Sequence, residues 1–397
     1  MTRLKNLLTG LGQHVRTELT AYAGRGLARQ VHGDSPGGDA QFDVDEVAER
    51  AVLAYLREHA DVPLAVYTED GSLVELAPDP RYVLVVDPID GTRPTSAGLE
   101  MGMVSIAAAP LAGPAPTLDD VTAAYLLEIK TGAWIYGDDD EGLSHGGFPH
   151  ALPRLSRTTD PAKMFWSIEF NGHPMRLMTA AYAHLVDRSA NTGGIFVFNS
   201  ATFSISRIIT GQLDAYVDIG NRVLRDHPAT EADFLAAGRG SILHLFPYDI
   251  AAATYLAKRA GVTITDAYGA DLGTTQLLDL DPMNQKSCIA AATPSCTRNC
   301  SAPSGGTSPA PPPPAQEEPD EGPDPERAAH GVAGRPPEAG GLGAHRRGGA
   351  GRADRHLRHR PQCAGGQVPR RAGCGDGTRG GRYRGHGGNG GDRAQAG

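Results

Sequence analysis

No part of this sequence limits the possible folds as sharply as residues 82–86, the run YVLVV, which leads directly into Asp87. A run that is apolar at every position has no polar face, so it predicts a strand buried on both sides. Such strands belong to α/β proteins, in which helices cover both faces of a sheet. Open sheets of this kind bind ligands at the carboxyl ends of their strands. The run therefore predicts an α/β fold with a ligand site next to Asp87.

The hexapeptide after this strand, DPIDGT (residues 87–92), combines two carboxylates with the start of a helix. Asp90 follows Asp87 closely enough for both side chains to meet at one point, with the carbonyl of Ile89 between them. Pro94 suits the first turn of a helix, whose free N–H groups form an anion site. Carboxylates repel a phosphate unless cations lie between them, which favours hard divalent ions such as Mg²⁺. The alternative is an Asp-rich turn that caps backbone N–H groups. One Asp alone would favour the turn, and the whole string favours the metal.

Composition divides the 397 residues into two parts. Residues 301–397 hold 24 of the 51 Gly and 13 of the 30 Pro, and almost no large apolar residues. Such a segment buries too little surface to offset the entropy lost on ordering. We expect one globular domain over residues 1–295 and a disordered Gly/Pro/Arg-rich tail over 296–397. A reading-frame shift in a G+C-rich gene is the preferred origin of the tail, and a true disordered extension is the alternative.

Charge and cysteine content exclude several classes of protein. The whole chain carries −9 and the tail +4, so residues 1–300 carry −13. An acidic body argues against nucleic-acid or membrane-surface binding and is compatible with a site that collects cations. No stretch is long and apolar enough for a membrane span, and the N-terminus is too polar for a signal peptide. Four of the five cysteines lie at or beyond the end of the expected domain, which leaves it only Cys288. No disulfide framework is expected, so the cytoplasm is the expected location.

Apolar spacing predicts the remaining elements. We expect an amphipathic helix over residues 1–30 and a second helix from a capping box of Asp43 and Glu46 to about His59. Short apolar runs predict strands at residues 64–67, 103–110, 121–131, 132–137, 213–219, 262–267 and 288–294. A strand and a helix are expected over 195–210. A further helix should begin near Asp249 and end before Gly261.

Four stretches, in order, resemble the inositol monophosphatase superfamily of Mg²⁺-dependent, lithium-sensitive phosphatases, which includes the archaeal-type fructose-1,6-bisphosphatase/inositol monophosphatase. The strand ending in DPIDGT is the most specific of them. Residues 66–70 (VYTED) are similar to a family segment whose first Glu bridges two metals. Residues 199–201 (NSA) with 211–216 (GQLDAY), and 247–253 (PYDIAAA) with 260–262 (AGV), resemble the two later signatures. The resemblance covers residues 1 to about 293.

This resemblance implies a layered αβαβα sandwich of the α/β (α+β) class, a homodimer, and a role for each site residue. Glu69, Asp87 and the Ile89 carbonyl would hold one Mg²⁺, and Asp87, Asp90 and Asp249 a second. A weaker third ion would bind near Glu69, and Mn²⁺ is a candidate substitute. Glu69 and Thr92 would act as catalytic residues by binding the attacking water. The residues implied in substrate binding are Asp90, Gly91, Thr92, Ser200, Ala201 and Asp218.

Each of these residues also has an alternative explanation. Asp249 suits a helix N-cap, Thr92 a second cap, and Glu69 a solvated loop acid. Their joint occurrence favours the metal site over all three. Asp45 resembles a family Asp that holds metal-bound water, and a helix cap explains it equally well.

Departures from the family pattern concern the substrate. After Asp-Gly-Thr most relatives have one residue and then Asn-Phe, whereas this chain has RPTS (residues 93–96). Arg93 contacts either a second phosphate or carboxylate on the substrate or the solvent, and solvent is the preferred reading. Tyr248 replaces the usual Trp. The connection over residues 221–247 is longer than in most relatives and lies beside the expected pocket.

The expected activity is that of a phosphoric monoester hydrolase. Its partner would be a small-molecule phosphate ester of a polyol or sugar, with inositol monophosphate, cleaved to inositol and phosphate, as the leading candidate. Fructose 1,6-bisphosphate comes second, and nucleotide 3′-phosphates and histidinol phosphate are further alternatives. A catalytically silent binding protein with this fold is the rival from another class, and the complete set of metal positions weighs against it.

Overall fold

A seven-stranded sheet forms one half of the fold, and it contains the buried apolar run of residues 82–86. A computed structural model describes residues 2–23, 29–69, 71–111 and 115–301 of the chain. The strand order of this sheet is β4-β3-β5-β6-β7-β8-β9. Only β3 and β5 are parallel neighbours, and the other pairs are antiparallel. The strands are β3 (Leu64–Thr68), β4 (Leu73–Glu75), β5 (Tyr82–Asp90), β6 (Met103–Pro110), β7 (Ala123–Glu128), β8 (Trp134–Asp138) and β9 (Gly142–Gly146).

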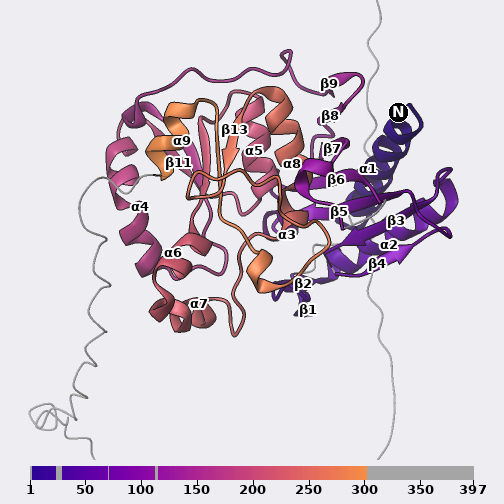
Figure 1. Ribbon diagram of the computed structural model, residues 1–397, viewed down its shortest axis with the longest axis horizontal. Helices are drawn as coiled ribbons and strands as arrows, with labels where there is room; N and C mark the ends of the chain where they lie inside the picture. Colours follow the sequence, from indigo (N-terminus) through magenta and orange to yellow (C-terminus); the bar gives the residue numbers. More distant parts are fainter. Residues whose placement is uncertain (1, 24–28, 70, 112–114, 302–397) are drawn as a thin grey trace, which may run out of the picture. The chain divides into compact units, whose positions relative to one another are not determined.

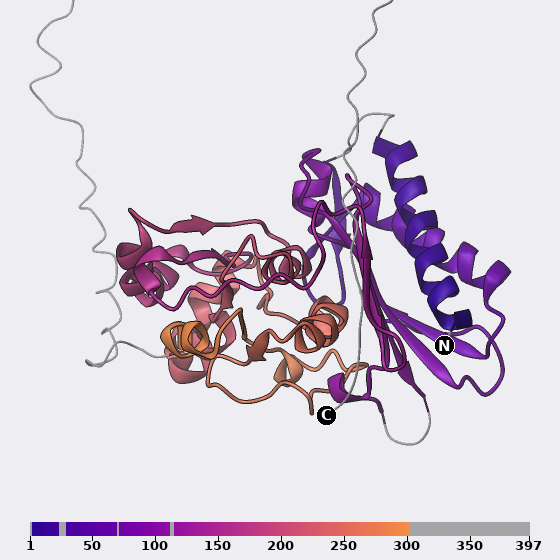
Figure 2. The same cartoon turned by 90° about the horizontal axis from the view of Figure 1, so that it is seen from above.

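The alternation of side chains along β5 explains why helices cover both faces of this sheet. Val83 and Val85 pack into one hydrophobic cluster, and Leu84 and Val86 into another on the opposite face. Helices α1 (Thr2–Ala23) and α2 (Asp43–His59) fill the second cluster. Figure 2 shows them, in indigo, along the outer face of the sheet. Helices α5 (Ala201–Ile209) and α8 (Pro247–Ala260) fill the first cluster.

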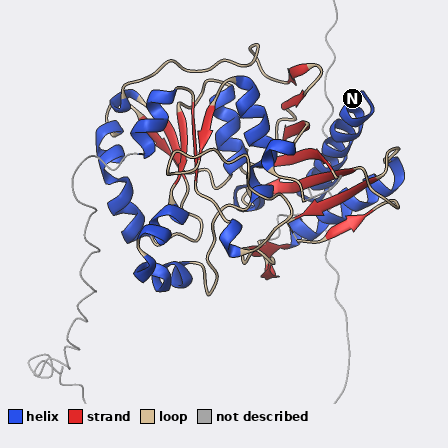
Figure 3. Cartoon of the chain, in the orientation of Figure 1, coloured by secondary structure: helices blue, strands red, loops and turns tan. Residues whose placement is uncertain are grey.

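A five-stranded sheet lies on the far side of α5 and α8. Its strand order is β11-β10-β12-β14-β13, with β10 parallel to both of its neighbours. The strands are β10 (Phe165–Ile168), β11 (Gly194–Phe196), β12 (Ala215–Asp218), β13 (Thr263–Thr265) and β14 (Cys288–Ala291). A third cluster on its outer face includes side chains of α4 (Met175–Ser189), α6 (Gly220–Asp226), α7 (Glu231–Ala237) and α9 (Pro294–Ser301). The layers are therefore helix, sheet, helix, sheet and helix, as predicted, and Figures 1 and 3 show this arrangement.

The smaller elements connect these layers. A two-stranded hairpin of β1 (Val31–Asp34) and β2 (Ala40–Phe42) precedes α2, and the short helix α3 (Thr92–Ser96) follows β5. Single 3₁₀ turns are η1 (Leu118–Asp120), η2 (Pro161–Lys163), η3 (Pro228–Thr230) and η4 (Pro282–Asn284). No helix in the described part of the chain is long and apolar enough to cross a membrane.

Three details differ from the sequence-based expectations. The first helix ends at Ala23 rather than near residue 30. The cap of α2 comes from Asp45, whose Oδ2 accepts the Phe42 N–H at 2.8 Å, and not from a box of Asp43 and Glu46. The boundary expected at residue 295 falls inside α9, which continues to Ser301 and buries Cys296 and Cys300. The tail expected to be disordered lies, beyond Ser301, outside the described residues.

Candidate active site

One pocket contains all ten side chains or backbone groups that the sequence indicated as site residues. It is an open pocket whose empty volume, including the solvent space at its mouth, is about 770 Å³. The ten are Glu69, Asp87, Ile89, Asp90, Gly91, Thr92, Ser200, Ala201, Asp218 and Asp249. Residues far apart in the sequence therefore meet in one place, from the ends of β3, β5 and β12 and the starts of α3, α5 and α8.

A β-bulge brings Asp87 and Asp90 to the same wall of the pocket. The strand was expected to end at Asp87, but in the structure it continues to Asp90. Asp87 pairs with Ser105 and Asp90 with Met103, so β5 has one residue more than β6 between these pairs. In a regular strand, residues three apart point to opposite faces, and the extra residue cancels that reversal. The Ile89 N–H donates to Asp87 Oδ1 at 3.0 Å and fixes the bulge.

Helix α5 holds the Asp90 carboxylate in place. Oδ2 of Asp90 accepts hydrogen bonds from the Ser200 hydroxyl at 2.5 Å, the Thr202 backbone N–H at 2.7 Å and the Thr202 hydroxyl. Ser200 also caps α5, because its Oγ accepts the Phe203 N–H at 3.2 Å. Ser200, expected to bind substrate, thus orients a carboxylate in this structure. Thr202 was missed, although its place two residues after the cap could have indicated it.

Gly91 is required by the geometry of the same turn. Its φ of +86° lies in the left-handed region. A Cβ atom at this position would lie 2.6 Å from the Met101 carbonyl oxygen. No larger residue fits there without moving backbone.

Asp249 is both a helix cap and a pocket carboxylate. Its Oδ2 accepts the Phe246 N–H at 2.7 Å, which caps α8. It also lines the pocket beside Asp90. Burial, and then the negative charges of Asp90, Asp39 and Asp218, raise the pKa of Asp249 well above its ordinary value. The two explanations of Asp249 offered by the sequence are therefore compatible.

Thr92 and Asp45 form a hydrogen-bonded pair at the edge of the pocket. Thr92 Oγ1 lies 3.1 Å from both Asp45 Oδ1 and the Ile89 carbonyl oxygen, and its single proton goes to one of them. The N-cap of α3 is Gly91, so Thr92 does not cap this helix. Asp45 caps α2 with Oδ2 and faces Thr92 with Oδ1. Burial raises the pKa of Asp45 to about 6.

The electrostatics of the pocket favour cations. Burial first, and then repulsion from neighbouring carboxylates, raises the pKa of Glu69 and Asp87 well above their ordinary values, so Glu69 is not a solvated loop acid. Burial also raises the pKa of Asp90, against its hydrogen bonds to Ser200 and Thr202. Across the described ranges, no group of three or more His, Cys, Asp or Glu side chains is arranged so that it could hold a metal ion as it stands. The donor set itself, carboxylates with the Ile89 carbonyl, fits hard divalent ions such as Mg²⁺.

Two carboxylates on the five-stranded sheet form the opposite wall. Asp218 ends β12 and Glu169 follows β10, its parallel neighbour, so both lie at carboxyl ends of adjacent strands. Asp218 accepts the Gly220 N–H at 3.0 Å, and Glu169 accepts the N–H groups of Phe170 and Asn171. Burial raises the pKa of both carboxyl groups to about 7. Glu169 was missed, and the acid directly after the run FWSI was the signal that could have indicated it.

Arg93 lines the pocket, and its side chain is 36% exposed. Its Nη2 donates to Asp39 Oδ1 at 2.6 Å and its Nη1 to Asp39 Oδ2 at 3.0 Å. Solvent was the preferred expectation for Arg93, but the guanidinium pairs with a carboxylate that the protein itself supplies. Asp39 was missed because it lies in a Gly-rich stretch, HGDSPGGDA, that resembles an ordinary turn.

The connection over residues 221–247 reaches the pocket, as expected. It forms α6, η3 and α7 and then a segment in which residues 243–246 line the pocket. Tyr248, in the place of the usual Trp, stacks on Phe246 with ring centroids 5.8 Å apart. Burial lowers the pKa of His173 and brings that of His244 to about 3, so both pocket histidines are neutral near pH 7.

A layered αβαβα sandwich with a pocket of buried carboxylates defines the class of sugar-phosphatase-like folds. The model of the inositol monophosphatase family matches residues 2–302, and the chain belongs to this family of phosphatases.

Known relatives agree with this assignment. The fructose-1,6-bisphosphatase of Pyrococcus furiosus is 25% identical over 261 residues, which cover 64% of this chain and 83% of that protein. The extragenic suppressor protein suhB of Bartonella henselae superimposes with a TM-score of 0.55 at 17% identity, covering 76% of this chain and 97% of that one. An inositol monophosphatase from Anabaena gives 0.50 at 17% identity, covering 75% and 92%. The two solved structures support the fold alone.

Proposed function

We propose that this protein hydrolyses a phosphomonoester of a polyol or sugar in a Mg²⁺-dependent reaction, with inositol monophosphate as the leading substrate. The observation that carries the proposal is the meeting of Glu69, Asp87, Asp90 and Asp249 in one pocket with the Ile89 carbonyl. Two or three ions would bind there, with Mn²⁺ as a substitute. When bound, such ions lower the pKa of water and neutralise charge on the phosphate and the leaving oxygen.

The protein's own groups would orient the water. Thr92 gives its hydroxyl proton to Asp45 or to the Ile89 carbonyl, so the lone pairs of Oγ1 are left to accept a proton of the attacking water. Glu69 would accept the other proton. With both protons held by acceptors, an oxygen lone pair of the water faces the phosphorus.

The remaining residues would bind the ester. Backbone N–H groups of Gly91 and Thr92 at the start of α3 are suited to phosphate oxygens. Asp90, Asp218 and the Ser200–Ala201 segment line the same pocket and would accept or donate hydrogen bonds to substrate hydroxyls. The homodimer and the cytoplasmic location expected from the sequence stay predictions.

Fructose 1,6-bisphosphate is the second candidate substrate. The observation that favours it is the similarity to the Pyrococcus furiosus fructose-1,6-bisphosphatase over most of that protein's length. No argument of equal strength supports nucleotide 3′-phosphates or histidinol phosphate.

Release of inorganic phosphate from a panel of inositol, sugar and nucleotide phosphates tests the proposal. We expect turnover with Mg²⁺, loss of turnover with a chelator, and recovery when Mg²⁺ is returned in excess. Absence of phosphate release from every ester with Mg²⁺ or Mn²⁺ would support the catalytically silent binding protein instead. Undiminished turnover in the chelator would show that the carboxylates serve another purpose.

A further inference from the structure

Arg93 is the one permanent cation among the described residues that line the pocket, and Asp39 occupies both of its terminal nitrogens. The two N–H···O contacts, at 2.6 Å and 3.0 Å, form a fork in which each guanidinium nitrogen meets a different carboxylate oxygen. The fork uses two of the five guanidinium N–H groups, and the paired carboxylate neutralises the charge that a second anionic group would need.

The protein holds Asp39 in place from several sides. Its Oδ1 also accepts the Ala40 N–H at 2.8 Å, and its Oδ2 accepts the Asn171 side-chain amide at 3.0 Å. Its backbone carbonyl accepts the Ser35 N–H at 2.6 Å, which closes the turn before β2. Burial alone would raise the pKa of Asp39, but the hydrogen bonds and charge of Arg93 reverse this and bring it below the ordinary value. Asp39 therefore stays ionised and fixed, as a permanent partner of Arg93.

The other described residues that line the pocket offer no permanent cation to a second anionic group. His173 and His244 are neutral, and the wall opposite the proposed metal ligands carries Glu169 and Asp218. A second phosphate would meet these acids without a free cation and would lose its hydration without compensation. The hydroxyl groups of a neutral carrier find acceptors there instead.

We propose that Asp39 is a specificity-determining residue, which neutralises Arg93 and so restricts the pocket to esters with a single phosphate on an uncharged carrier. The inference rests on the proposed function, because it concerns the substrate of that same pocket. If the Asp39–Arg93 ion pair were merely structural, breaking it would change only the stability of the protein. If Asp39 determines specificity, freeing Arg93 must also change which substrate is preferred.

The test compares wild type with Asp39→Asn, Arg93→Gln and the double variant, using inositol 1-phosphate and fructose 1,6-bisphosphate. Asp39→Asn keeps the size of the side chain and an oxygen for the Ala40 N–H, but removes the charge. We expect it to raise kcat/KM for the bisphosphate, relative to the monophosphate, at least tenfold. Adding Arg93→Gln should cancel that gain, because the freed guanidinium is its cause.

An unchanged ratio in folded Asp39→Asn, or a gain that persists in the double variant, would overturn the proposal. If Asp39→Asn does not fold, Arg93→Lys replaces it, because an ammonium cannot keep both contacts of the fork. The ratio should then move in the same direction by a smaller factor. If wild type cleaves neither ester, the proposed function fails, and calorimetric binding of fructose 1,6-bisphosphate still decides the role of Asp39. Its affinity must rise in Asp39→Asn and fall again in the double variant.

Discussion

Single residues of the site were predictable where the chemistry depends on residue type, and unpredictable where it depends on backbone geometry. Two Asp and a Gly-Thr after a buried strand indicate a metal and phosphate site by themselves. The bulge that turns Asp87 and Asp90 to one side is set by the register of β5 against β6, which no local pattern contains. Asp39 reaches the pocket only through the tertiary fold, so its neighbours in the sequence do not mark it, whereas the apolar run before Glu169 was an available signal.

Asp87→Asn should separate catalysis from stability. The amide oxygen can still accept the Ile89 N–H. The substitution removes the negative charge of Asp87, a carboxyl group whose pKa is raised by burial and by the charge of Asp90. We expect phosphate release to fall by at least roughly 100-fold, because the ion that would activate the water loses a ligand. The melting temperature in chelator should stay level or rise, and the stabilisation by added Mg²⁺ should shrink. Asp233→Asn on exposed α7 is the control for removing one negative charge. Normal turnover of Asp87→Asn would contradict the metal site.

The raised pKa of Asp218 predicts how the stability of the protein depends on pH. Its pKa is 3.8 in the reference state and about 7 in the fold, because the group is buried. Between these values the folded chain holds a proton that the unfolded chain has lost, so the contribution of Asp218 to stability declines as pH rises from about 4 to about 7. Asp218→Asn, which can still accept the Gly220 N–H, should therefore gain stability relative to wild type, by about 2 kcal/mol between pH 5 and pH 7. Urea unfolding in chelator at several pH values measures the difference. A constant difference would show that Asp218 is not buried as described.

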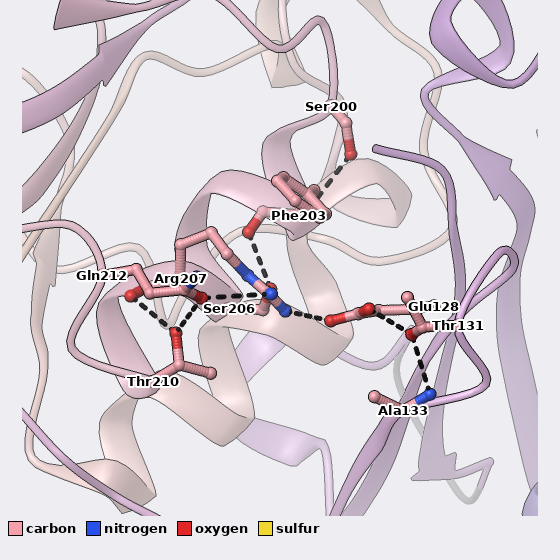
Figure 4. A network of polar contacts seen from close by, with 9 residues as sticks. All are labelled: Glu128, Thr131, Ala133, Ser200, Phe203, Ser206, Arg207, Thr210 and Gln212. Carbon is pink, nitrogen blue, oxygen red and sulfur yellow. Dashed lines mark hydrogen bonds and ion pairs between the residues drawn. The ribbon is translucent and has the colours of Figure 1, made fainter. Parts of the chain in front are cut away.

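At the scale of the elements, α5 is held at both ends by polar contacts to the seven-stranded sheet. Its first turn binds Asp90 on β5 through Ser200 and Thr202. Near its end, Arg207 Nη2 donates to Glu128 Oε1 on β7 at 2.5 Å, and Glu128 also accepts the Thr131 hydroxyl (Figure 4). The side chains of this ion pair are 9% and 6% exposed. Because the pair spans residues far apart in the sequence, the helix was predictable but its attachment was not.

Arg207→Met should be strongly destabilising. It leaves the Glu128 carboxylate buried without its partner, which typically costs about 3–5 kcal/mol. The double variant Arg207→Met/Glu128→Gln should recover much of this loss, because no unpaired charge remains. Arg50→Met, which breaks an exposed ion pair with Glu46, is the control and should cost less than about 1 kcal/mol. Denaturant unfolding of the three variants gives the comparison. Equal losses for Arg207→Met and Arg50→Met would mean that the Glu128 site is accessible to water.

At the scale of the whole molecule, the order of layers followed from the sequence because buried strands and amphipathic helices differ in period. The elements that were not expected include β10 (Phe165–Ile168) and α4 (Met175–Ser189). β10 has only four residues, too few for a periodic pattern. In α4, Met178, Tyr182 and Leu185 have helical spacing and are buried, so this helix was within reach of the pattern. The end of the domain was misplaced because α9 has a polar, Cys-containing sequence with little apolar signal.

Because α9 ends at Ser301, chains that end after Ser301 and after Ser295 should differ in melting temperature but not in turnover. Among the described residues, all those that line the pocket precede Asp249 or are Asp249 itself, and the members of the three hydrophobic clusters end at Cys300. The chain ending at Ser301 should therefore keep the turnover and melting temperature of the full chain. The chain ending at Ser295 loses the buried side chains of Cys296 and Cys300, each worth roughly 1–2 kcal/mol. It should melt several degrees lower while retaining turnover at low temperature, because α9 packs on the outer face of the five-stranded sheet, away from the pocket. Loss of turnover in the chain ending at Ser301, with its fold intact, would assign residues 302–397 a role in the reaction.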